Sequence, residues 1–375
     1  MPELYRSWVE VSRSRIAENY RAVKEAVGAR VEVTPVVKAD AYRHGAIEVS
    51  RVLEAEGVRW LAVSNVEEGV TLREAGIQAR LMVMADFLPF EREALIEYNL
   101  TPALHHLEDI AAFDMLARQA GVTAHYHLKL DSGMGRLGVR GDSPSIARAV
   151  QGASNANLEG LMTHFASAAD YTSPQTDQQQ ARFLQLAREL AALGIRPKFL
   201  HMASTIATAY GRDEAWGNMV RPGQAIYGYV SPARGEAPKQ IVKVRPALSW
   251  KAAILAVKDL PEGALVGYGG IFRTSKPTRI AILAVGYADG LPHRLSNRGK
   301  VIAGGKLAPI IGSVSMDVTA IDITELPGLK VGDAVTLLGE EGGERLDAQQ
   351  IARTAGTISY SVLCGISARV KRVYV

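Results

Sequence analysis

A lysine at the end of an apolar run is the residue that most directly suggests chemistry. The run from Val31 to Val37 predicts a buried strand, and Lys38 follows at its carboxyl end. Burying an ammonium group is costly unless it is paired or reacts. A Schiff base with an aldehyde cofactor is one reaction that removes the charge. A lysine that extends from a strand end into a solvated loop is the alternative.

Other polar residues follow predicted strands in the same way. Each has a plain explanation by itself, such as a capping hydroxyl, a satisfied core histidine or a solvated arginine. Several such places on different strands favour a shared site, because the chemistry of a (β/α)8 barrel lies at the carboxyl ends of its strands. The places are Lys38, Arg136, His164, Ser204 with Thr205, and Arg221.

The first 230 or so residues alternate short apolar runs with amphipathic helical patterns. We predict strands over 32–38, 59–64, 80–85, 100–105, 123–131, 158–165, 198–203 and 219–227, and helices over 12–28, 44–57, 66–76, 90–99, 107–121, 143–153 and 176–193. Eight strands separated by helices favour a (β/α)8 TIM-type barrel. A doubly wound open sheet is the alternative, but no glycine-rich dinucleotide motif follows the first strand. Residues 133–138 fit G-x-G-x-x-G in letters only, after the fifth strand.

The pattern changes from about residue 240. Alternating runs separated by glycine, proline and aspartate turns predict a mostly antiparallel β domain, with one helix over 347–355 before the last strand. The predicted strands are 247–257, 278–285, 300–303, 317–323 and 334–338. The proline-containing stretch 232–238 is the best linker candidate. We therefore predict a barrel over 1–235 and a β-rich domain over 236–375.

Composition is that of an ordinary globular protein, with 375 residues, 47% hydrophobic, 22% charged and a net charge of +4. The length favours two domains. Basic residues are mixed with acidic ones, so neither nucleic acid nor a membrane surface is an expected partner. A single cysteine, Cys364, excludes an internal disulfide and a cysteine-rich zinc site. Neither a signal peptide nor a membrane-spanning run is recognised, so we expect a cytoplasmic enzyme.

The string VVKADAYRHG at residues 36–45 resembles the pyridoxal phosphate (PLP) signature of the alanine racemase family. The resemblance extends over nearly the whole sequence, and the motifs follow in the family's order. They are KLDSGMGRLG at 129–138, THFA at 163–166, VRPG at 220–223, GYG at 267–269, GYADG at 286–290, SMD at 315–317 and TISY at 357–360. The resemblance implies a PLP-dependent isomerase that interconverts L- and D-alanine and supplies D-alanine for peptidoglycan.

The resemblance also implies roles for residues of the barrel. Lys38 carries PLP, and Arg136 holds the substrate carboxylate, for which a planar pair of donors is suited. Arg221 faces the pyridine nitrogen, and a cation there disfavours protonation of the ring. A less electron-withdrawing ring suppresses transamination and decarboxylation. The other implied cofactor contacts are Tyr42, His164, Ser204, Thr205, Gly223, Gln224 and Tyr360, with His201 supporting the ring arginine.

The β domain supplies the second acid/base by resemblance. Tyr268 reaches the active site of a partner subunit, which implies an obligate homodimer with shared sites. Lys38 then serves D-alanine and Tyr268 serves L-alanine, on opposite faces of the substrate. Tyr287 narrows the entrance, Met316 offers its backbone N–H to the substrate carboxylate, and Asp317 lies close by. A strand tyrosine packed on the core is the plain alternative, which the flanking glycines of Tyr268 disfavour.

Lys129 is a separate case. Strand alternation places it on the same face as His127 and Asp131. An ion pair with Asp131 or a nearby acid is the plain interpretation. In many family members the matching lysine carries a carbamate that orients the arginine matching Arg136, and we expect the same here.

The sequence departs from the family pattern at several positions near the substrate or its entrance. Ser204 and Thr205 replace the usual Asn-Ser, Gln224 replaces an aliphatic residue, Gly267 a serine and Ser315 a cysteine. These changes leave a racemase of serine, lysine or a broader range as an alternative. A PLP decarboxylase would be expected to place a carboxylate against the pyridine nitrogen, and a non-enzymatic PLP carrier would not need the β domain. Metal ligands are not expected.

Overall fold

The structure is a computed structural model that describes residues 5–85 and 88–375. Its contacts divide the protein into two units, which we name the barrel unit and the β unit. The barrel unit consists of Ser14–Ala41 and Ala46–Arg245. The β unit contains residues 5–13, the short segment Tyr42–Gly45, and Pro246–Val375. The contact units therefore differ from a single division at residue 235, because two short segments of the first half belong to the β unit.

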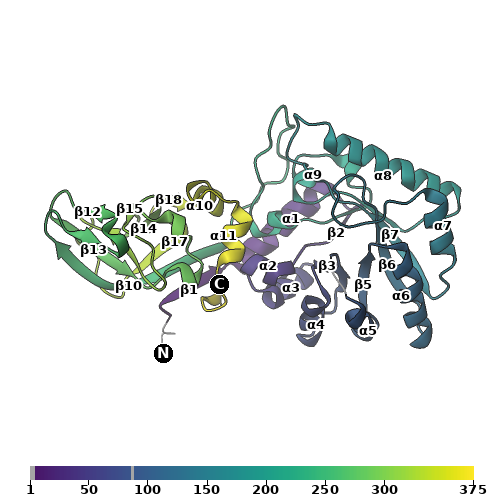
Figure 1. The fold of residues 1–375 in the computed structure, drawn as a ribbon, viewed down its shortest axis with the longest axis horizontal. Helices are drawn as coiled ribbons and strands as arrows, with labels where there is room; N and C mark the ends of the chain where they lie inside the picture. Colours follow the sequence, from purple (N-terminus) through teal and green to yellow (C-terminus); the bar gives the residue numbers. More distant parts are fainter. Residues whose placement is uncertain (1–4, 86–87) are drawn as a thin grey trace. The chain divides into compact units, whose positions relative to one another are not determined.

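Eight parallel strands form the barrel unit. β3 to β8 lie side by side in sequence order, and β2 pairs with β9. Isolated bridges from Val36 to Ala62 and from Ser204 to Arg221 join this pair to the two edges of the sheet, which closes the barrel. Figure 1 shows several strands of this sheet, among them β3, β5, β6 and β7. The strands are β2 (Glu32–Val33), β3 (Trp60–Val63), β4 (Arg80–Val83), β5 (Leu100–Leu104), β6 (Ala124–Lys129), β7 (Ala156–Met162), β8 (Phe199–His201) and β9 (Met219–Val220).

Helices connect successive strands, as a parallel sheet requires. They are α1 (Arg13–Val27), α3 (Ala46–Ala55), α4 (Val66–Glu74), α5 (Arg92–Glu97), α6 (Leu107–Gln119), α7 (Ser143–Gln151), α8 (Gln175–Ala192) and α9 (Thr205–Ala209). Local sequence determines where several begin. Asn65 caps α4 by accepting a hydrogen bond from the backbone of Glu68, and Asp142 caps α7 in the same way. Strands such as β3 are buried at every position, which explains their continuous apolar sequences.

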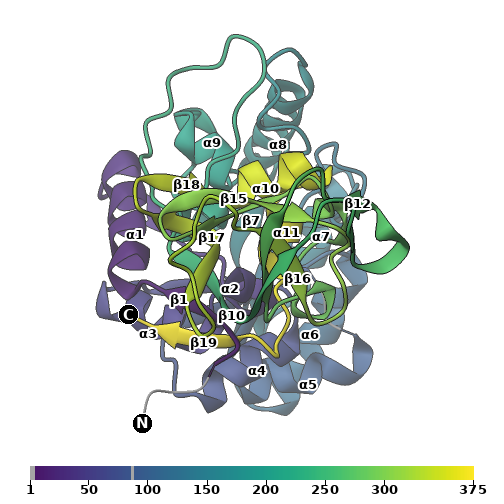
Figure 2. The same ribbon diagram turned by 90° about the vertical axis from the view of Figure 1, so that its left-hand side faces the viewer.

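The β unit is built mainly of antiparallel strands. Its large sheet has the order β18-β17-β14-β15-β16-β13-β10-β1-β19, and a further pairing of β17 with β10 closes six of these strands into a ring. The strands are β1 (Ser7–Val11), β10 (Leu248–Leu260), β13 (Thr278–Leu283), β14 (Lys300–Ala303), β15 (Lys306–Ile311), β16 (Thr319–Asp322), β17 (Ala334–Glu341), β18 (Glu344–Leu346) and β19 (Lys371–Tyr374). β1 lies between β10 and β19 (Figure 2).

Smaller elements complete the β unit. β11 (Leu265–Val266) and β12 (Phe272–Arg273) form a hairpin, and the helices α10 (Ala348–Ala355) and α11 (Ser359–Gly365) precede β19. The first half of β10 alternates buried and partly buried residues, the pattern of a strand with one face on a core.

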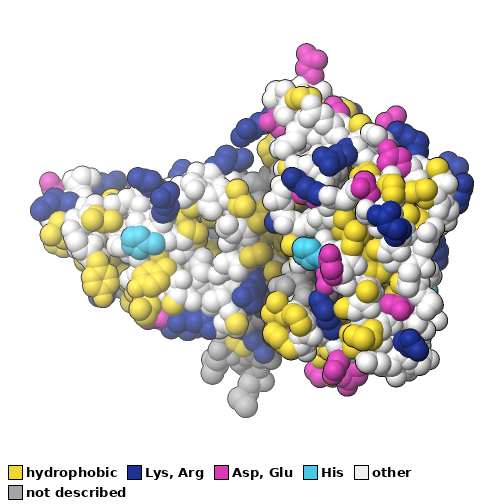
Figure 3. All heavy atoms as spheres, turned by 45° about the vertical axis from the view of Figure 1, so that its right-hand side comes forward, with side chains coloured by type: hydrophobic (Ala, Val, Ile, Leu, Met, Phe, Trp, Pro, Cys, Tyr) yellow, Lys and Arg dark blue, Asp and Glu magenta, His cyan; other side chains and the backbone are white. Residues whose placement is uncertain are grey.

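On the face in Figure 3, acidic and basic side chains are interspersed. No helix among the described residues is long and apolar enough to cross a membrane.

The predicted fold class is confirmed, and most predicted elements are present within a few residues. Three predictions need correction. The strand predicted over 32–38 ends at Val33 apart from the bridge at Val36, and the one over 219–227 ends at Val220, where a 3-10 turn over Gln224–Tyr227 follows. The linker candidate 232–238 is attached to the barrel unit, because the backbone of Arg234 bonds Ala169 and Tyr171.

Candidate active site

Lys38 begins a short helix of unusual hand. Helix α2 (Lys38–Arg43) has positive φ angles, between 52° and 66°, at all five residues after Lys38. This is the left-handed conformation, which costs roughly 1–2 kcal/mol per non-glycine residue. Two carboxylates hold this segment: Glu68 accepts from the N–H of Ala39 in α2 at 2.6 Å, and Asp40 of α2 accepts from the N–H of Ala46, the first residue of α3, at 2.8 Å. The second oxygen of Glu68 accepts from Ser64 at the end of β3, which ties Lys38 to the neighbouring strand.

Cationic groups gather at the carboxyl ends of the barrel strands. Lys129 ends β6 with 6% of its surface exposed. The pKa of Lys129 is lowered to about 8, mainly by burial and also by the charges of Arg136, Arg221 and Lys38, against an opposing effect of Asp131. Burial also lowers the pKa of His164 to about 3, with the same four cations contributing. The charges of Lys38, Arg136 and Arg221, which the sequence placed at strand ends, therefore act on both Lys129 and His164.

Lys129 has no ion pair among the described residues, contrary to its plain interpretation. Asp131 pairs with Arg140 instead, at 2.7 Å from its Nε. The other oxygen of Asp131 accepts from the N–H groups of residues 133, 134 and 135 at 2.9–3.1 Å. These bonds lower the pKa of Asp131 although burial raises it. Asp131 thus organises the loop that leads into Arg136, whose side chain is exposed.

Arg221 is a fully buried cation held by four hydrogen bonds. Its Nη1 lies 2.7 Å from Nδ1 and 3.1 Å from the carbonyl oxygen of His201, and its Nη2 donates to the carbonyls of Thr163 and Met202 at 2.7 and 3.2 Å. Burial lowers the pKa of Arg221 to about 10, so it stays charged at neutral pH. Among the described residues, no carboxylate pairs with Arg221, and its Nε–H makes no hydrogen bond.

The second ring nitrogen of His201 contacts a residue that the sequence did not assign to the site. Nε2 of His201 lies 2.7 Å from Nδ1 of His127, and neither ring is exposed to solvent. Burial is the main cause that lowers the pKa of both histidines, to about 3 for His127. The predicted contact of His201 with Arg221 is therefore present, and both ring nitrogens of His201 make hydrogen bonds within the barrel unit.

Hydroxyl and backbone N–H groups collect beside Arg221. Ser204 precedes α9 at its N-cap position, without a side-chain capping bond, and forms an isolated β-bridge with Arg221. The hydroxyl of Thr205 accepts from the N–H of Gly223 at 3.0 Å. Gln224 is fully buried at the start of the following 3-10 turn. Such hydroxyl and amide donors are the groups from which a phosphate accepts hydrogen bonds. In the β unit, the rings of Tyr42 and Tyr360 meet at 5.9 Å.

The β unit brings Tyr287, Met316 and Asp317 together. The backbone N–H of Tyr287 donates to the carbonyl of Ser315 at 2.9 Å, and that of Ala288 to Met316 at 3.0 Å. A Cβ on Gly286 would lie 2.2 Å from the carbonyl oxygen of Ser315, so only glycine allows this approach.

Arg369 was not foreseen from the sequence, and it links these segments. Its Nε bonds the buried Asp289 at 2.7 Å, and its Nη2 bonds Asp317 at 2.6 Å. Asp289 in turn accepts from the backbone of Gly286 at 2.8 Å. No sequence motif pointed to Arg369, since its partners lie 52 and 80 residues away.

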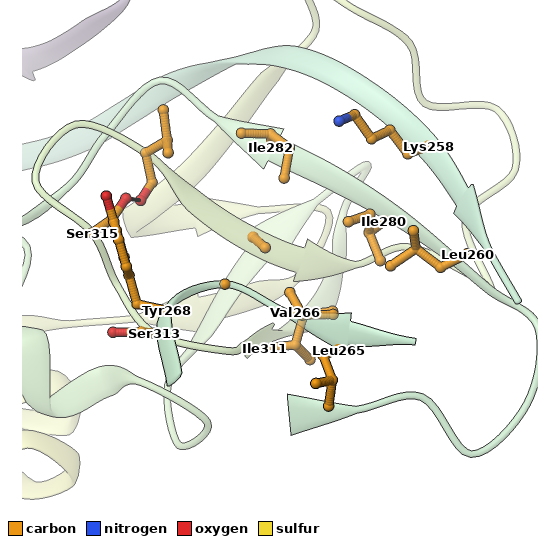
Figure 4. Close-up of a pocket in the computed structure, with 13 residues that line it drawn as sticks. Lys258, Leu260, Leu265, Val266, Tyr268, Ile280, Ile282, Ile311, Ser313 and Ser315 are labelled. Carbon is orange, nitrogen blue, oxygen red and sulfur yellow. Dashed lines mark hydrogen bonds between the residues drawn. The ribbon is translucent and has the colours of Figure 1, made fainter. Parts of the chain in front are cut away.

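Tyr268 stands at the tip of the β11–β12 hairpin with 78% of its surface exposed. Gly267 before it has φ of +72°, a conformation that L side chains rarely adopt. Figure 4 shows Tyr268 beside Ser313 and Ser315 at one end of a pocket of about 510 Å³. Aliphatic residues, among them Leu260, Leu265, Val266, Ile280, Ile282 and Ile311, line much of the remainder. The hydroxyl of Ser315 donates to the carbonyl of Val318 at 2.6 Å.

Comparisons with known proteins agree with this geometry. The family model "Alanine racemase, N-terminal domain" matches residues 11–232, and "Alanine racemase, C-terminal domain" matches 247–374. The alanine racemase of Halothermothrix orenii is 40% identical over 373 residues, which cover 98% of this chain and 96% of the relative.

Two solved structures are similar over almost their full length. That of alanine racemase from Bacillus anthracis with bound L-Ala-P has a TM-score of 0.90 at 34% identity, covering 100% of this chain and 96% of that one. That of alanine racemase from Bartonella henselae with covalently bound pyridoxal phosphate has a TM-score of 0.88 at 26% identity, covering 99% and 100%.

The matches over both units define an isomerase with a barrel and a β domain. The chain belongs to the alanine racemase family. The sequence predictions of the family and of an isomerase are confirmed. Within the described residues, no group of three or more His, Cys, Asp or Glu side chains could hold a metal ion.

Proposed function

We propose that this protein interconverts L-alanine and D-alanine with PLP held on Lys38. One observation carries the proposal beyond family membership. Arg221 is a buried cation without a carboxylate partner among the described residues, and one of its N–H groups is open. A group of this kind matches an unprotonated pyridine nitrogen, which accepts a hydrogen bond. A decarboxylase, for which a carboxylate is expected at this place, is disfavoured by the same observation.

The residues of the site fit PLP in their donor chemistry. Lys38 provides the amine, His164 lies near the same cations, and Arg221 provides a donor for the ring nitrogen. The proposed phosphate contacts are Tyr42, Ser204, Thr205, Gly223, Gln224 and Tyr360. When bound, PLP supplies an electron-withdrawing ring that makes the α-proton of the amino acid acidic. The prediction of PLP as cofactor is confirmed for the family.

Arg221 limits the reaction that follows. A cation beside the ring nitrogen disfavours its protonation, so the ring withdraws less charge. The burial of Arg221 strengthens this effect because little solvent screens its charge. The enzyme is thereby restricted to proton removal and return at one carbon. Arg136 and the backbone N–H of Met316 orient the substrate carboxylate, with Asp317 and Tyr287 at the entrance.

Two bases are required because the proton leaves one face of the α-carbon and returns on the other. Lys38 removes it from D-alanine, and Tyr268 removes it from L-alanine. We propose that Tyr268 acts in the site of a partner subunit, so that the enzyme is an obligate homodimer with an isologous interface. Three exposed side chains on its hairpin support this: Tyr268 at 78%, Leu265 at 56% and Ile271 at 53% exposed. Exposed apolar groups of this kind mark protein interfaces.

Lys129 is proposed to carry a carbamate. Its amine is buried among cations, and its lowered pKa of about 8 leaves a fraction neutral and able to react with carbon dioxide. The product would be an anion beside Arg136, which would orient that guanidinium. Intact-mass measurement of the active enzyme with and without bicarbonate tests this, and a fully active enzyme with unmodified Lys129 would contradict it.

Substrate range is tested by incubating the purified enzyme with L-alanine, L-serine and L-lysine separately and measuring the D-enantiomers. Preference for alanine would make the changes at Ser204, Gln224, Gly267 and Ser315 neutral. Preference for serine or lysine would agree with the proposed two-base mechanism but would contradict alanine as the substrate. PLP binding without any racemisation would contradict the proposal and favour a decarboxylase or a carrier. A cytoplasmic location stays a prediction that cell fractionation would test.

A further inference from the structure

Three buried side chains form a hydrogen-bonded series through the middle of the barrel. Arg221 contacts His201, and His201 contacts His127, each at 2.7 Å between nitrogen atoms. Arg221 is 2% exposed and both histidines are 0% exposed. We name these three residues the buried triad. The series begins at the proposed ring-nitrogen contact and ends at His127, for which no role has yet been given.

The chemistry of Arg221 determines where the protons of the triad lie. A guanidinium only donates hydrogen bonds, so Nδ1 of His201 must accept. A neutral His201 then carries its proton on Nε2, and this N–H donates a hydrogen bond to Nδ1 of His127. His127 accepts on Nδ1 and carries its own proton on Nε2. If either histidine became an imidazolium, two donors would face each other at 2.7 Å.

The position of His127 is strongly constrained by its neighbours. Phe199 stacks on its ring at 5.9 Å and 21°, and Trp60 meets it edge-on at 5.5 Å. On the third side, a Cβ at Gly160 would approach Nδ1 to 2.4 Å, so the ring and the β7 backbone are in contact. These contacts restrict the ring of His127, whose Nδ1 lies 2.7 Å from Nε2 of His201.

Nε2 of His127 has no hydrogen-bond partner in the described part of the chain. Trp60 and Phe199 also line a pocket of about 330 Å³, whose lining residues do not include His127. These two rings therefore stand between His127 and that solvent-accessible space. Arg80 lies 3.9 Å over the Trp60 ring and is itself paired with Glu159 at 2.7 Å. A buried donor without an acceptor is unfavourable, and it calls for a compensating role.

We propose that His127 is a positioning residue for Arg221, acting through His201. By accepting a hydrogen bond from the Nε2–H of His201, it stabilises the tautomer in which Nδ1 of His201 accepts from the guanidinium. Arg221 is then held through its two Nη groups, which leaves its Nε–H without a hydrogen-bond partner in the described part of the chain. The inference rests on the proposed function for its effect on catalysis, but the proton positions follow from the triad alone.

The first test needs neither the cofactor nor a variant. Nitrogen-15 NMR of histidine-labelled protein, prepared free of PLP, reports the tautomer of His201, since the sequence has only 8 histidines. The expected result is a neutral ring protonated on Nε2 between pH 5 and 8. A His201 ring protonated on Nδ1, or on both nitrogens, would overturn the proposal.

Variants of His127 test the consequence. His127→Asn keeps an acceptor near the position of Nδ1, whereas His127→Leu removes it. We expect the asparagine variant to retain the wild-type nitrogen-15 signal of His201. In the leucine variant the Nε2–H of His201 has no acceptor at position 127, so we expect this signal to be lost. In the PLP-loaded enzyme, the leucine variant should form more pyruvate by transamination per D-alanine made, on the order of tenfold, the size typical of a second-layer partner. His125→Leu changes an exposed histidine of the same strand and serves as the control.

The outcomes separate this inference from the proposed function. A wild-type enzyme that makes no D-alanine would contradict the proposed function. The NMR result would then still show whether the protons of the buried triad lie where we propose. An unchanged His201 signal and unchanged pyruvate ratio in His127→Leu would overturn the positioning role. If the leucine variant does not fold, loss of the His201 signal in His127→Asn would overturn it as well, because that variant keeps the acceptor.

Discussion

Acid should destabilise this protein through its buried neutral histidines, and His127 allows the effect to be isolated. The pKa of His127 is lowered to about 3 from an ordinary value of 6.5, mainly by burial and then by the charges of Arg80, Arg221 and His125. Below pH 6.5 the unfolded chain binds a proton at this ring and the folded protein does not. The stability that His127 contributes is therefore fully present above pH 6.5 and is lost as the pH falls toward 3.

The size of the effect follows from the shift. One pKa unit corresponds to about 1.4 kcal/mol, so lowering the pH from 7 to 5 should remove about 2 kcal/mol of unfolding free energy through His127. His127→Asn cannot take up this proton. The difference in unfolding free energy between wild type and variant should therefore change by about 2 kcal/mol across this range, in favour of the variant at pH 5.

Equilibrium unfolding in urea at pH 7, 6 and 5 measures this difference, with refolding checked at each pH. His125→Asn is the matched control, because it removes an exposed histidine from the same strand. Parallel curves for wild type and His127→Asn would refute the reasoning. They would mean that the native protein binds the proton as readily as the unfolded chain, and that the triad is not the neutral series derived from the geometry.

Three substitutions test other parts of the structure. The hydroxyl of Tyr126 is buried without a hydrogen-bond partner in the described residues, so Tyr126→Phe should leave stability unchanged or raise it by about 1 kcal/mol in urea unfolding. Asp131→Ala removes the acceptor that organises the loop leading to Arg136, and steady-state kinetics should show KM for alanine raised by on the order of tenfold. Gly160→Ala places a Cβ 2.4 Å from His127, and thermal unfolding should show a loss of about 1–3 kcal/mol.

Each of these expectations can fail clearly. A large loss of stability in Tyr126→Phe would mean that the hydroxyl has a partner in solution. An unchanged KM in Asp131→Ala, with normal folding, would separate the loop from substrate binding. A fully stable Gly160→Ala would show that His127 can move aside, which would weaken the argument that its ring is fixed.

The barrel was predictable because each strand is an apolar run between helical patterns. β3, β4 and β5 lie within a residue or two of their predicted bounds, since local pattern and burial agree there. β1 alternates clearly over Ser7–Val11, but its partners in β10 lie about 240 residues away along the sequence. Its place in the β unit could not be inferred from local pattern.

The types of the site residues were predictable from the sequence. The backbone conformation and the neighbouring side chains that hold them in place were less so. The left-handed helix α2 contains no glycine, so nothing in its sequence signals positive φ, and contacts from Glu68 and Asp40 stabilise it. Strand alternation placed His127 on the face of Lys129, and both are buried as that implies. The contact of His127 with His201 depends on the packing of two separate strands, which no spacing in the sequence reveals.

The central claim is that Lys38 and Tyr268 act as bases on opposite faces of the same carbon. The most direct test is exchange of the α-proton in D2O, measured by NMR on L-alanine and D-alanine separately with the Tyr268→Phe enzyme. The account predicts that D-alanine still exchanges through Lys38, that L-alanine does not, and that racemisation is lost in both directions. Exchange of both enantiomers at wild-type rates in this variant would contradict the two-base assignment.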